Sequence, residues 1–217
     1  MIELGGNMDN IQYFTVDGTS ALELDEKKSR FIAVVTHVET SQDVESFVAK
    51  LKKNNKDAKH IPYGFVLGKD LATAKNNDDG EPGGSAGAPI SEAIKQAGFT
   101  NCLVAVVRYH GGINLGKSKL TSTYFKVSSE ALKLAKIARM VDCAVYALTV
   151  KYPDFTSIGT YLRDNRLPII SAEYGDVVSL RVAFPSGEVD KHISEIKMKM
   201  TEEFMCSKID SAYFRID

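Results

Sequence analysis

The feature that most constrains this chain is the unbroken apolar run at residues 102–107. A run without polar alternation is typical of a central strand buried on both faces. An amphipathic pattern predicts a helix over residues 85–96, closed by Gly98, and a second helix over residues 118–138. Strand and helices in this order predict a mixed α+β domain.

The segment before this run adds a hairpin and a further helix. Residues 21–24 and 30–38 are short apolar strands joined by the charged turn 25–29. Residues 41–54 carry apolar side chains at i, i+3, i+4 and i+7, with lysines in the last turn, which predicts a helix. A strand is predicted at residues 63–67, directly after a proline.

The last third of the chain has its own pattern. The order of predicted elements is strand, helix, strand, strand, helix, strand, which is the ferredoxin-like βαββαβ unit. We therefore expect two domains, residues 1–139 and 140–217, with a short join near residues 139–142. The predicted elements are strand 143–150, helix 154–164, strands 167–173 and 177–184, helix 189–200 and strand 204–214.

Composition limits which cell compartment and which binding partners we expect. The net charge of −1 argues against binding nucleic acid through bulk positive charge, so such binding would need a local patch. Cys102, Cys143 and Cys206 are odd in number and far apart, which suits reduced thiols and a cytoplasmic location. Residues 1–10 lack the pattern of a signal peptide, and no apolar stretch is long enough to span a membrane.

Two glycine-rich segments, residues 78–89 and 108–118, each precede a predicted helix. Glycine lets backbone N–H groups approach a ligand closely, and a helix start adds unpaired donors and positive potential. The sequence therefore predicts an anion-binding site. Its candidate residues are the acidic turn Asp78, Asp79 and Glu81, the glycine loop Gly83, Gly84, Ser85 and Gly87, and the anion or nucleic-acid contacts Lys28, Arg30, His60, Arg108, Tyr109, His110, Gly111, Gly112, Gly116, Lys117 and Lys119.

Residues 111–118, GGINLGKS, match the phosphate-loop pattern GxxxxGK[ST] between a predicted strand and a predicted helix. Nucleotide hydrolysis at such a loop also needs a downstream acidic residue that helps to hold Mg²⁺. Asp142 is the nearest candidate and falls at the expected domain junction. We therefore expect phosphate binding without hydrolysis.

A series of motifs runs along the chain: KKSRF at residues 27–31, DAKH at 57–60, DDGEP at 78–82, GSAG at 84–87 with Pro89, VVRY at 106–109, GGI at 111–113 and LG at 115–116. In the order and spacing of these motifs, the chain resembles the IMPACT (YigZ-like) family over nearly its whole length. It differs at His110, where the family usually has an aromatic residue, and at residues 117–119, KSK, which replace a stretch that is usually small and glycine-rich.

The resemblance implies an N-terminal domain with the fold of the second domain of a ribosomal small-subunit protein. It implies a C-terminal domain similar to the last domain of elongation factor G. Eukaryotic relatives regulate translation by competing with a stress kinase for its activating scaffold, mainly through an extra N-terminal domain, and we do not expect that role here. For bacterial members the resemblance implies a nucleic-acid or ribosome-associated role.

Three functional hypotheses follow. The first is a non-catalytic cytosolic protein that binds RNA or the ribosome and modulates translation, with Tyr109 or His110 stacking on a base. The second is an enzyme acting on a phosphorylated small molecule or nucleotide, with the acidic turn as acid, base or metal ligand. The third is a scaffold that acts through protein contacts alone. We expect no cofactor, no metal and no membrane partner, and the sequence leaves the oligomeric state open.

Several candidates also have a purely structural interpretation. Arg108 at a strand end can form an ion pair with Asp78, Asp79 or Glu81 instead of binding a ligand. The acidic turn can cap a helix start. His60 can be a hydrogen-bonded structural histidine as readily as a general base.

Overall fold

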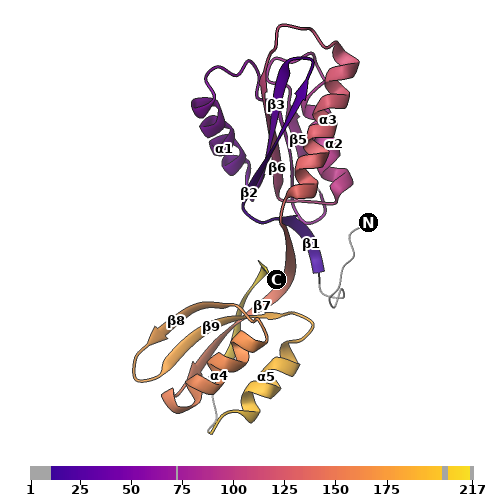
Figure 1. Cartoon of the computed structure of the whole chain (residues 1–217). Coiled ribbons are helices and arrows are strands. Elements are labelled where there is room, and N and C mark those ends of the chain that lie inside the picture. Colours follow the sequence, from indigo (N-terminus) through magenta and orange to yellow (C-terminus); the bar gives the residue numbers. More distant parts are fainter. Residues whose placement is uncertain (1–10, 72, 202–204, 216–217) are drawn as a thin grey trace. The chain divides into compact units, whose positions relative to one another are not determined.

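The structure is a computed structural model that describes residues 11–71, 73–201 and 205–215 (Figure 1). It divides into two compact units, residues 13–138 and residues 139 onward together with residues 11 and 12. It stays a prediction that each unit is an independent domain. The same holds for the expected similarity of each unit to a domain of another protein. The expectations for residues 1–10 and for Phe204, the first residue of the last predicted strand, lie outside the described residues.

The first unit is built on a five-stranded sheet of order β2-β3-β6-β4-β5, in which all neighbours are antiparallel. The middle strand, β6, is the apolar run, and it is buried from Cys102 to Arg108. This confirms the predicted central strand. The strands are β2 Thr19–Glu26, β3 Ser29–His37, β4 Tyr63–Leu67, β5 Thr73–Asn77 and β6 Cys102–Tyr109, and the helices are α1 Ser41–Asn54, α2 Gly87–Ala97 and α3 Lys117–Leu134.

Helix α1 covers one face of this sheet, and α2 and α3 cover the other (Figure 1). Alternate residues of β6 take part in the two cores. Leu103 packs in the core that contains α1 residues, whereas Val104 packs in the core that contains residues of α2 and α3. Because side chains alternate along a strand, Arg108 lies on the α2/α3 side and Tyr109 lies on the α1 side.

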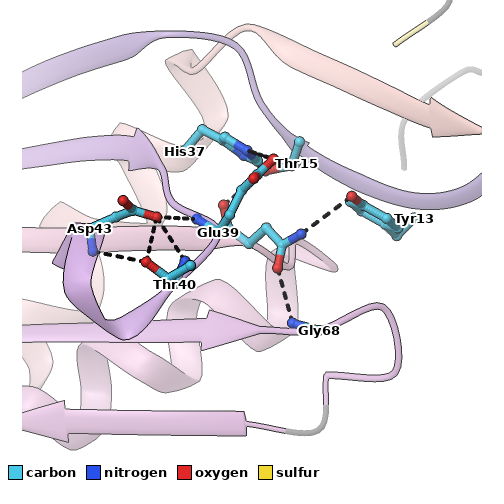
Figure 2. A network of polar contacts seen from close by, with 8 residues as sticks. Tyr13, Thr15, His37, Glu39, Thr40, Asp43 and Gly68 are labelled. Atoms are coloured by element: carbon cyan, nitrogen blue, oxygen red, sulfur yellow. Dashed lines mark hydrogen bonds and ion pairs between the residues drawn. The ribbon is translucent and has the colours of Figure 1, made fainter. Parts of the chain in front are cut away.

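A polar network around Asn101 ties loops to strands at one end of this sheet. Figure 2 shows its partners Tyr13, Thr15 and Gly68. The Asn101 side chain accepts a 2.9 Å hydrogen bond from the N–H of Gly68 and donates a 3.3 Å bond to the Tyr13 hydroxyl. The Asn101 carbonyl accepts from Thr15 Oγ1 at 3.1 Å and from the N–H of Val38 at 3.0 Å. Strand β1, Ile11–Val16, the end of β3 and the β4–β5 loop are thereby held together.

Beside this network, α1 begins with a capping box. Thr40 Oγ1 accepts from the N–H of Asp43, and the Asp43 carboxylate accepts from the N–H of Thr40 (Figure 2). These bonds to Thr40 lower the pKa of Asp43. The cap explains why the predicted start of this helix is confirmed to the residue.

The second unit has the element order βαββαβ predicted from the sequence. Its strands lie in the order β10-β7-β9-β8 with antiparallel neighbours, and β1 also adjoins β7. Leu148, Leu180, Ile158 and Ile196 belong to one core that joins the sheet to both helices. The elements are β7 Ile137–Val150, α4 Tyr152–Asp164, β8 Ile169–Tyr174, β9 Val178–Pro185, α5 Val189–Met198 and β10 Met205–Arg215.

The mixed α+β class predicted from the sequence is therefore confirmed. Helix α3 ends at Leu134 and not at residue 138, because the chain is already in strand β7 at Ile137. Cys102 and Cys143 are buried free thiols, and Cys206 is half-buried. No helix within the described residues is long and apolar enough to cross a membrane.

Candidate anion-binding cleft

Residues of both glycine-rich segments line one cleft of about 310 Å³ in the first unit. We call it the anion-binding cleft. Gly80 and Glu81 come from the first segment, and Arg108 and Lys117 come from the second. The full lining is Lys59, His60, Gly80, Glu81, Pro82, Arg108, His110, Asn114, Leu115, Gly116, Lys117 and Leu120.

A buried charged network lies at the cleft. Arg108 Nη1 donates to Glu81 Oε1 at 2.5 Å, and both side chains are almost fully buried. The Tyr124 hydroxyl of α3 donates to the same oxygen at 2.7 Å. Arg108 therefore forms the structural ion pair that the sequence left open, and its partner is Glu81. Burial, and then the neighbouring Glu81, raise the pKa of Tyr124, so its hydroxyl stays protonated.

Arg108 is not saturated by this pair. Its guanidinium lies 5.4 Å above the Phe31 ring, and Nη2 lies 3.4 Å from His110 Nδ1. The Nε–H is buried and has no hydrogen-bond partner among the described residues. A buried donor without a partner is costly. Arg108 therefore keeps one buried donor without a hydrogen-bond partner among the described residues.

The first glycine-rich segment uses its amides internally. Asp78 accepts hydrogen bonds from the N–H groups of Gly84 at 2.7 Å, Ala86 at 3.0 Å and Gly87 at 2.9 Å. The amides of Gly84 and Gly87, which we expected to face a ligand, donate to this carboxylate instead. The anion at the start of α2 is supplied by the chain itself. Ser85 donates its own N–H to the Pro82 carbonyl, and Gly83 is exposed.

Asp79 is also engaged by neighbouring groups. Its carboxylate accepts from the N–H of Ile61 at 2.7 Å and from Lys52 Nζ at 2.5 Å. The carboxylates of Asp78, Asp79 and Glu81 thus each accept hydrogen bonds from other groups of the chain. Within the described residues, no cluster of three or more His, Cys, Asp or Glu side chains is arranged to hold a metal ion.

From Gly112 onward, the second glycine-rich segment keeps its backbone donors free of partners among the described residues. Helix α3 begins at Lys117 without a side-chain cap and without an acidic residue in its first turn. No backbone N–H from Gly112 to Lys119 donates to another described residue. Unpaired N–H groups at the positive end of a helix attract an anion. Gly111 is different, because its N–H donates to Ser29 Oγ at 3.2 Å.

The phosphate-loop pattern lacks its usual setting. Strand β6, which precedes the loop, is antiparallel to both β3 and β4. In phosphate-loop proteins the loop joins a strand to a helix within a βαβ arrangement, whose strands are parallel. The match at residues 111–118 therefore indicates local anion-binding chemistry and not that class of fold.

Two histidines line the cleft with defined hydrogen-bond roles. His60 Nδ1 lies 2.7 Å from the Asp79 carbonyl oxygen, which can only accept, so Nδ1 carries a proton. His110 Nδ1 faces Arg108 Nη2, which can only donate, so this nitrogen is the acceptor. His60 also pairs with Arg108 in an isolated antiparallel bridge.

Several predicted contacts lie outside the cleft lining. Arg30 places its guanidinium 4.6 Å from the centre of the Tyr109 ring, and the Tyr109 hydroxyl donates to Asn55 Oδ1 at 2.8 Å. Arg30 and Tyr109 are thus on the α1 side of the sheet. Lys119 pairs with Glu26 at 2.8 Å. Lys28, Gly111 and Gly112 also lie outside the lining, as do Asp78, Asp79, Gly83, Gly84, Ser85 and Gly87.

Sequence reasoning singled out neither Asn114 nor Tyr124. Asn114 lies inside the phosphate-loop pattern. Tyr124 lies within the helix predicted over residues 118–138. Its burial beside Glu81 depends on tertiary packing, so no local signal identifies its role.

Comparison with known proteins places these features in a wider context. Residues 27–132 match the Impact N-terminal domain. The chain is 31% identical over 190 residues to "IMPACT family member YvyE" of Bacillus subtilis, covering 88% of this chain and 86% of that protein. It is 33% identical over 165 residues to "IMPACT family member YigZ" of Escherichia coli, covering 75% and 81%.

A solved structure described as "Crystal structure of an hypothetical protein" has the same fold over most of the chain. It aligns with a TM-score of 0.63 at 28% sequence identity. The alignment covers 91% of this chain and 97% of the other.

Proposed function

Since this chain belongs to the IMPACT family, we propose that it binds RNA by holding a backbone phosphate in the anion-binding cleft. The observation that carries the proposal is the run of free N–H groups from Gly112 to Lys119 at the start of α3. Such a helix start is a ready site for phosphate. The cleft opens onto this helix start through Gly116 and Lys117.

Charge supports a local contact of this kind. The chain as a whole carries a net charge of −1, so attraction to RNA must come from a limited region. Lys59 and Lys117 bring two cations to the cleft, in addition to Arg108, whose charge is neutralised by Glu81. A volume of about 310 Å³ lies at the low end of small-ligand sites. It suits one phosphate with its sugar.

The contacts of the acidic turn argue against a catalytic role for its carboxylates. Asp78 and Asp79 accept hydrogen bonds from the chain's own N–H groups, and Glu81 neutralises Arg108. These carboxylate oxygens are already engaged by groups of the chain and are therefore less available to a substrate. The enzyme hypothesis would therefore depend on other residues. The proposal includes a role in translation, through binding of ribosomal RNA.

Fluorescence anisotropy with a short single-stranded RNA across a salt series tests the proposal. Affinity should fall steeply with added salt, and Lys117→Ala should weaken binding and reduce the salt slope by about 1. Lys133→Ala is the matched control, because Lys133 is an exposed lysine in the last turn of the same helix. Binding that ignores salt, or that is the same in Lys117→Ala and wild type, would contradict the proposal.

Ribosome co-sedimentation in the same salt series tests the translational part. Wild-type protein should sediment with ribosomes at low salt and be released as salt rises. Lys117→Ala should be released at lower salt than Lys133→Ala. RNA binding in solution without ribosome association would remove the translational part and keep the RNA site.

A further inference from the structure

His60, which lines the cleft, has one ring nitrogen without a hydrogen-bond partner among the described residues. Because Nδ1 donates to the Asp79 carbonyl, Nε2 is the ring nitrogen that remains to accept a hydrogen bond. The ring lies in the cleft lining and is half-buried. No hydrogen bond joins Nε2 to another described residue. The two nitrogens lie on different edges of the ring, so Nε2 is directed away from the Asp79 carbonyl.

The ring is held in position by the turn beneath it. Gly80 has a left-handed φ of 85°, and a Cβ there would lie 3.2 Å from both Cε1 and Nδ1 of His60. The ring therefore packs closely against backbone that carries no side chain. Asp79 fixes the same turn through Ile61 and Lys52. An acceptor held this way is preorganised for its partner.

The neighbouring cleft groups that attract an anion are donors. Arg108, Lys117 and the free N–H groups at the start of α3 bind a phosphate, which RNA and DNA share. None of these donors can distinguish the two nucleic acids through the phosphate alone. An acceptor beside the phosphate can do so, because the ribose 2′-hydroxyl donates a hydrogen bond that deoxyribose lacks.

The position of His60 matches the chemistry of the ribose. His60 and Arg108 are partners in an antiparallel bridge, and side chains of such partners lie on the same face. In RNA, the 2′-hydroxyl and the 3′-phosphate are on adjacent carbons of one ring. A 3′-phosphate held near Arg108 therefore brings its neighbouring hydroxyl toward His60.

We infer that His60 Nε2 forms a subsite for a ribose 2′-hydroxyl, so the cleft prefers RNA to DNA of the same sequence. This inference rests on the proposed RNA binding at the same cleft. It adds a specificity-determining residue to a site otherwise defined by charge. One added hydrogen bond corresponds to a preference of about 2- to 10-fold.

The test compares three single strands of one sequence on the full-length wild-type protein: RNA, DNA and 2′-O-methyl RNA. Anisotropy at one fixed salt concentration should show RNA bound about 2- to 10-fold more tightly than DNA. The 2′-O-methyl strand should bind like DNA, because its oxygen has no proton to donate. This comparison needs no variant and so does not depend on folding of a mutant.

Two substitutions of His60 distinguish the roles of its two ring nitrogens. In His60→Asn, the shorter amide can still donate to the Asp79 carbonyl but leaves nothing at the Nε2 position, so the preference for RNA should disappear. In His60→Gln, the longer side chain returns an oxygen acceptor toward that position and should restore part of the preference. Lys117→Ala is the matched control, since it should weaken RNA and DNA by the same factor.

The outcomes distinguish the two proposals. Absence of wild-type binding to both nucleic acids overturns the proposed function together with this inference. Equal wild-type affinity for RNA, DNA and 2′-O-methyl RNA overturns the inference alone. A preference for RNA that survives in folded His60→Asn overturns the assignment to His60.

Discussion

Tyr124 donates a 2.7 Å hydrogen bond to Glu81, at the same carboxylate oxygen that accepts from Arg108. The Glu81 side chain is 2% exposed and that of Arg108 is 6% exposed. A buried ion pair of this kind combines a charge from the first glycine-rich segment with one from the second. The shape of the cleft therefore depends on this network.

We expect Glu81→Gln to destabilise the protein strongly. The substitution leaves the buried Arg108 without its counter-charge, and breaking such a pair costs about 3–5 kcal/mol. Urea unfolding followed by circular dichroism measures the loss. Tyr124→Phe is the control, because it removes one hydrogen bond and keeps the ion pair, for a loss of about 1 kcal/mol. A Glu81→Gln protein as stable as Tyr124→Phe would contradict the expectation.

Asp78 should contribute stability that depends on pH. Burial by itself would raise the pKa of Asp78, but the backbone bonds from Gly84, Gly87 and Ala86 and the charge of Lys117 lower it below the usual 3.8. A folded-state pKa below the unfolded value gives stability that is present above the unfolded pKa. That stability is lost as pH falls through the folded pKa.

Comparing wild type with Asp78→Asn in urea measures this contribution. Near pH 7, Asp78→Asn should be less stable by about 1.5–3 kcal/mol, because charge-assisted bonds to N–H groups are lost. The difference should shrink as pH falls below about 4, where the wild-type carboxylate takes up a proton. A difference that stays constant from neutral to acid pH would show that ionisation of Asp78 does not contribute.

Elements with strong local signals were predictable from the sequence. Helix α1, Ser41–Asn54, combines an amphipathic pattern with a capping Thr40 and lysines in its last turn, and its predicted bounds are confirmed. Strand β4, Tyr63–Leu67, was predicted exactly, with Pro62 limiting its start. Each signal acts within a few residues, so no knowledge of the tertiary fold was needed.

Strand β5 could not be predicted in the same way. Its sequence from Thr73 to Asn77, TAKNN, is polar and exposed, and it has no apolar alternation. It is an edge strand whose only strand partner among the described residues is β4. Its conformation is set by this ladder and not by local preference.

The candidate site shows the same division between local and tertiary signals. Alternation along β6 already indicates that Tyr109 points away from the side of Arg108, so its absence from the cleft was foreseeable. The capture of the Gly84 and Gly87 amides by Asp78 was not foreseeable. It depends on how a loop folds back over six to nine residues, as the separations of these partners show.

We expect Gly111→Ala to destabilise the contact between the second glycine-rich segment and the hairpin turn. A Cβ at Gly111 would lie 1.9 Å from the Lys28 carbonyl oxygen, so backbone must move. Overpacking of this kind costs about 1–3 kcal/mol, which chemical unfolding detects. Gly83→Ala is the matched control, because a Cβ there meets no atom within 4 Å, and it should change stability by less than about 0.5 kcal/mol.

Replacing the β2–β3 turn should instead stabilise the protein. Lys27 and Lys28 both have left-handed φ, 45° and 67°, at the two central positions of this hairpin. Such turns favour Asn-Gly, and left-handed backbone costs an ordinary residue about 1–2 kcal/mol. Lys27→Asn with Lys28→Gly should therefore raise the free energy of unfolding by about 1–2 kcal/mol, measured in urea.

RNA affinity of the same variant tests the predicted phosphate contact of Lys28, because loss of that contact should weaken binding while stability rises. A variant less stable than wild type would show that the lysines stabilise the turn through contacts that outweigh the backbone strain.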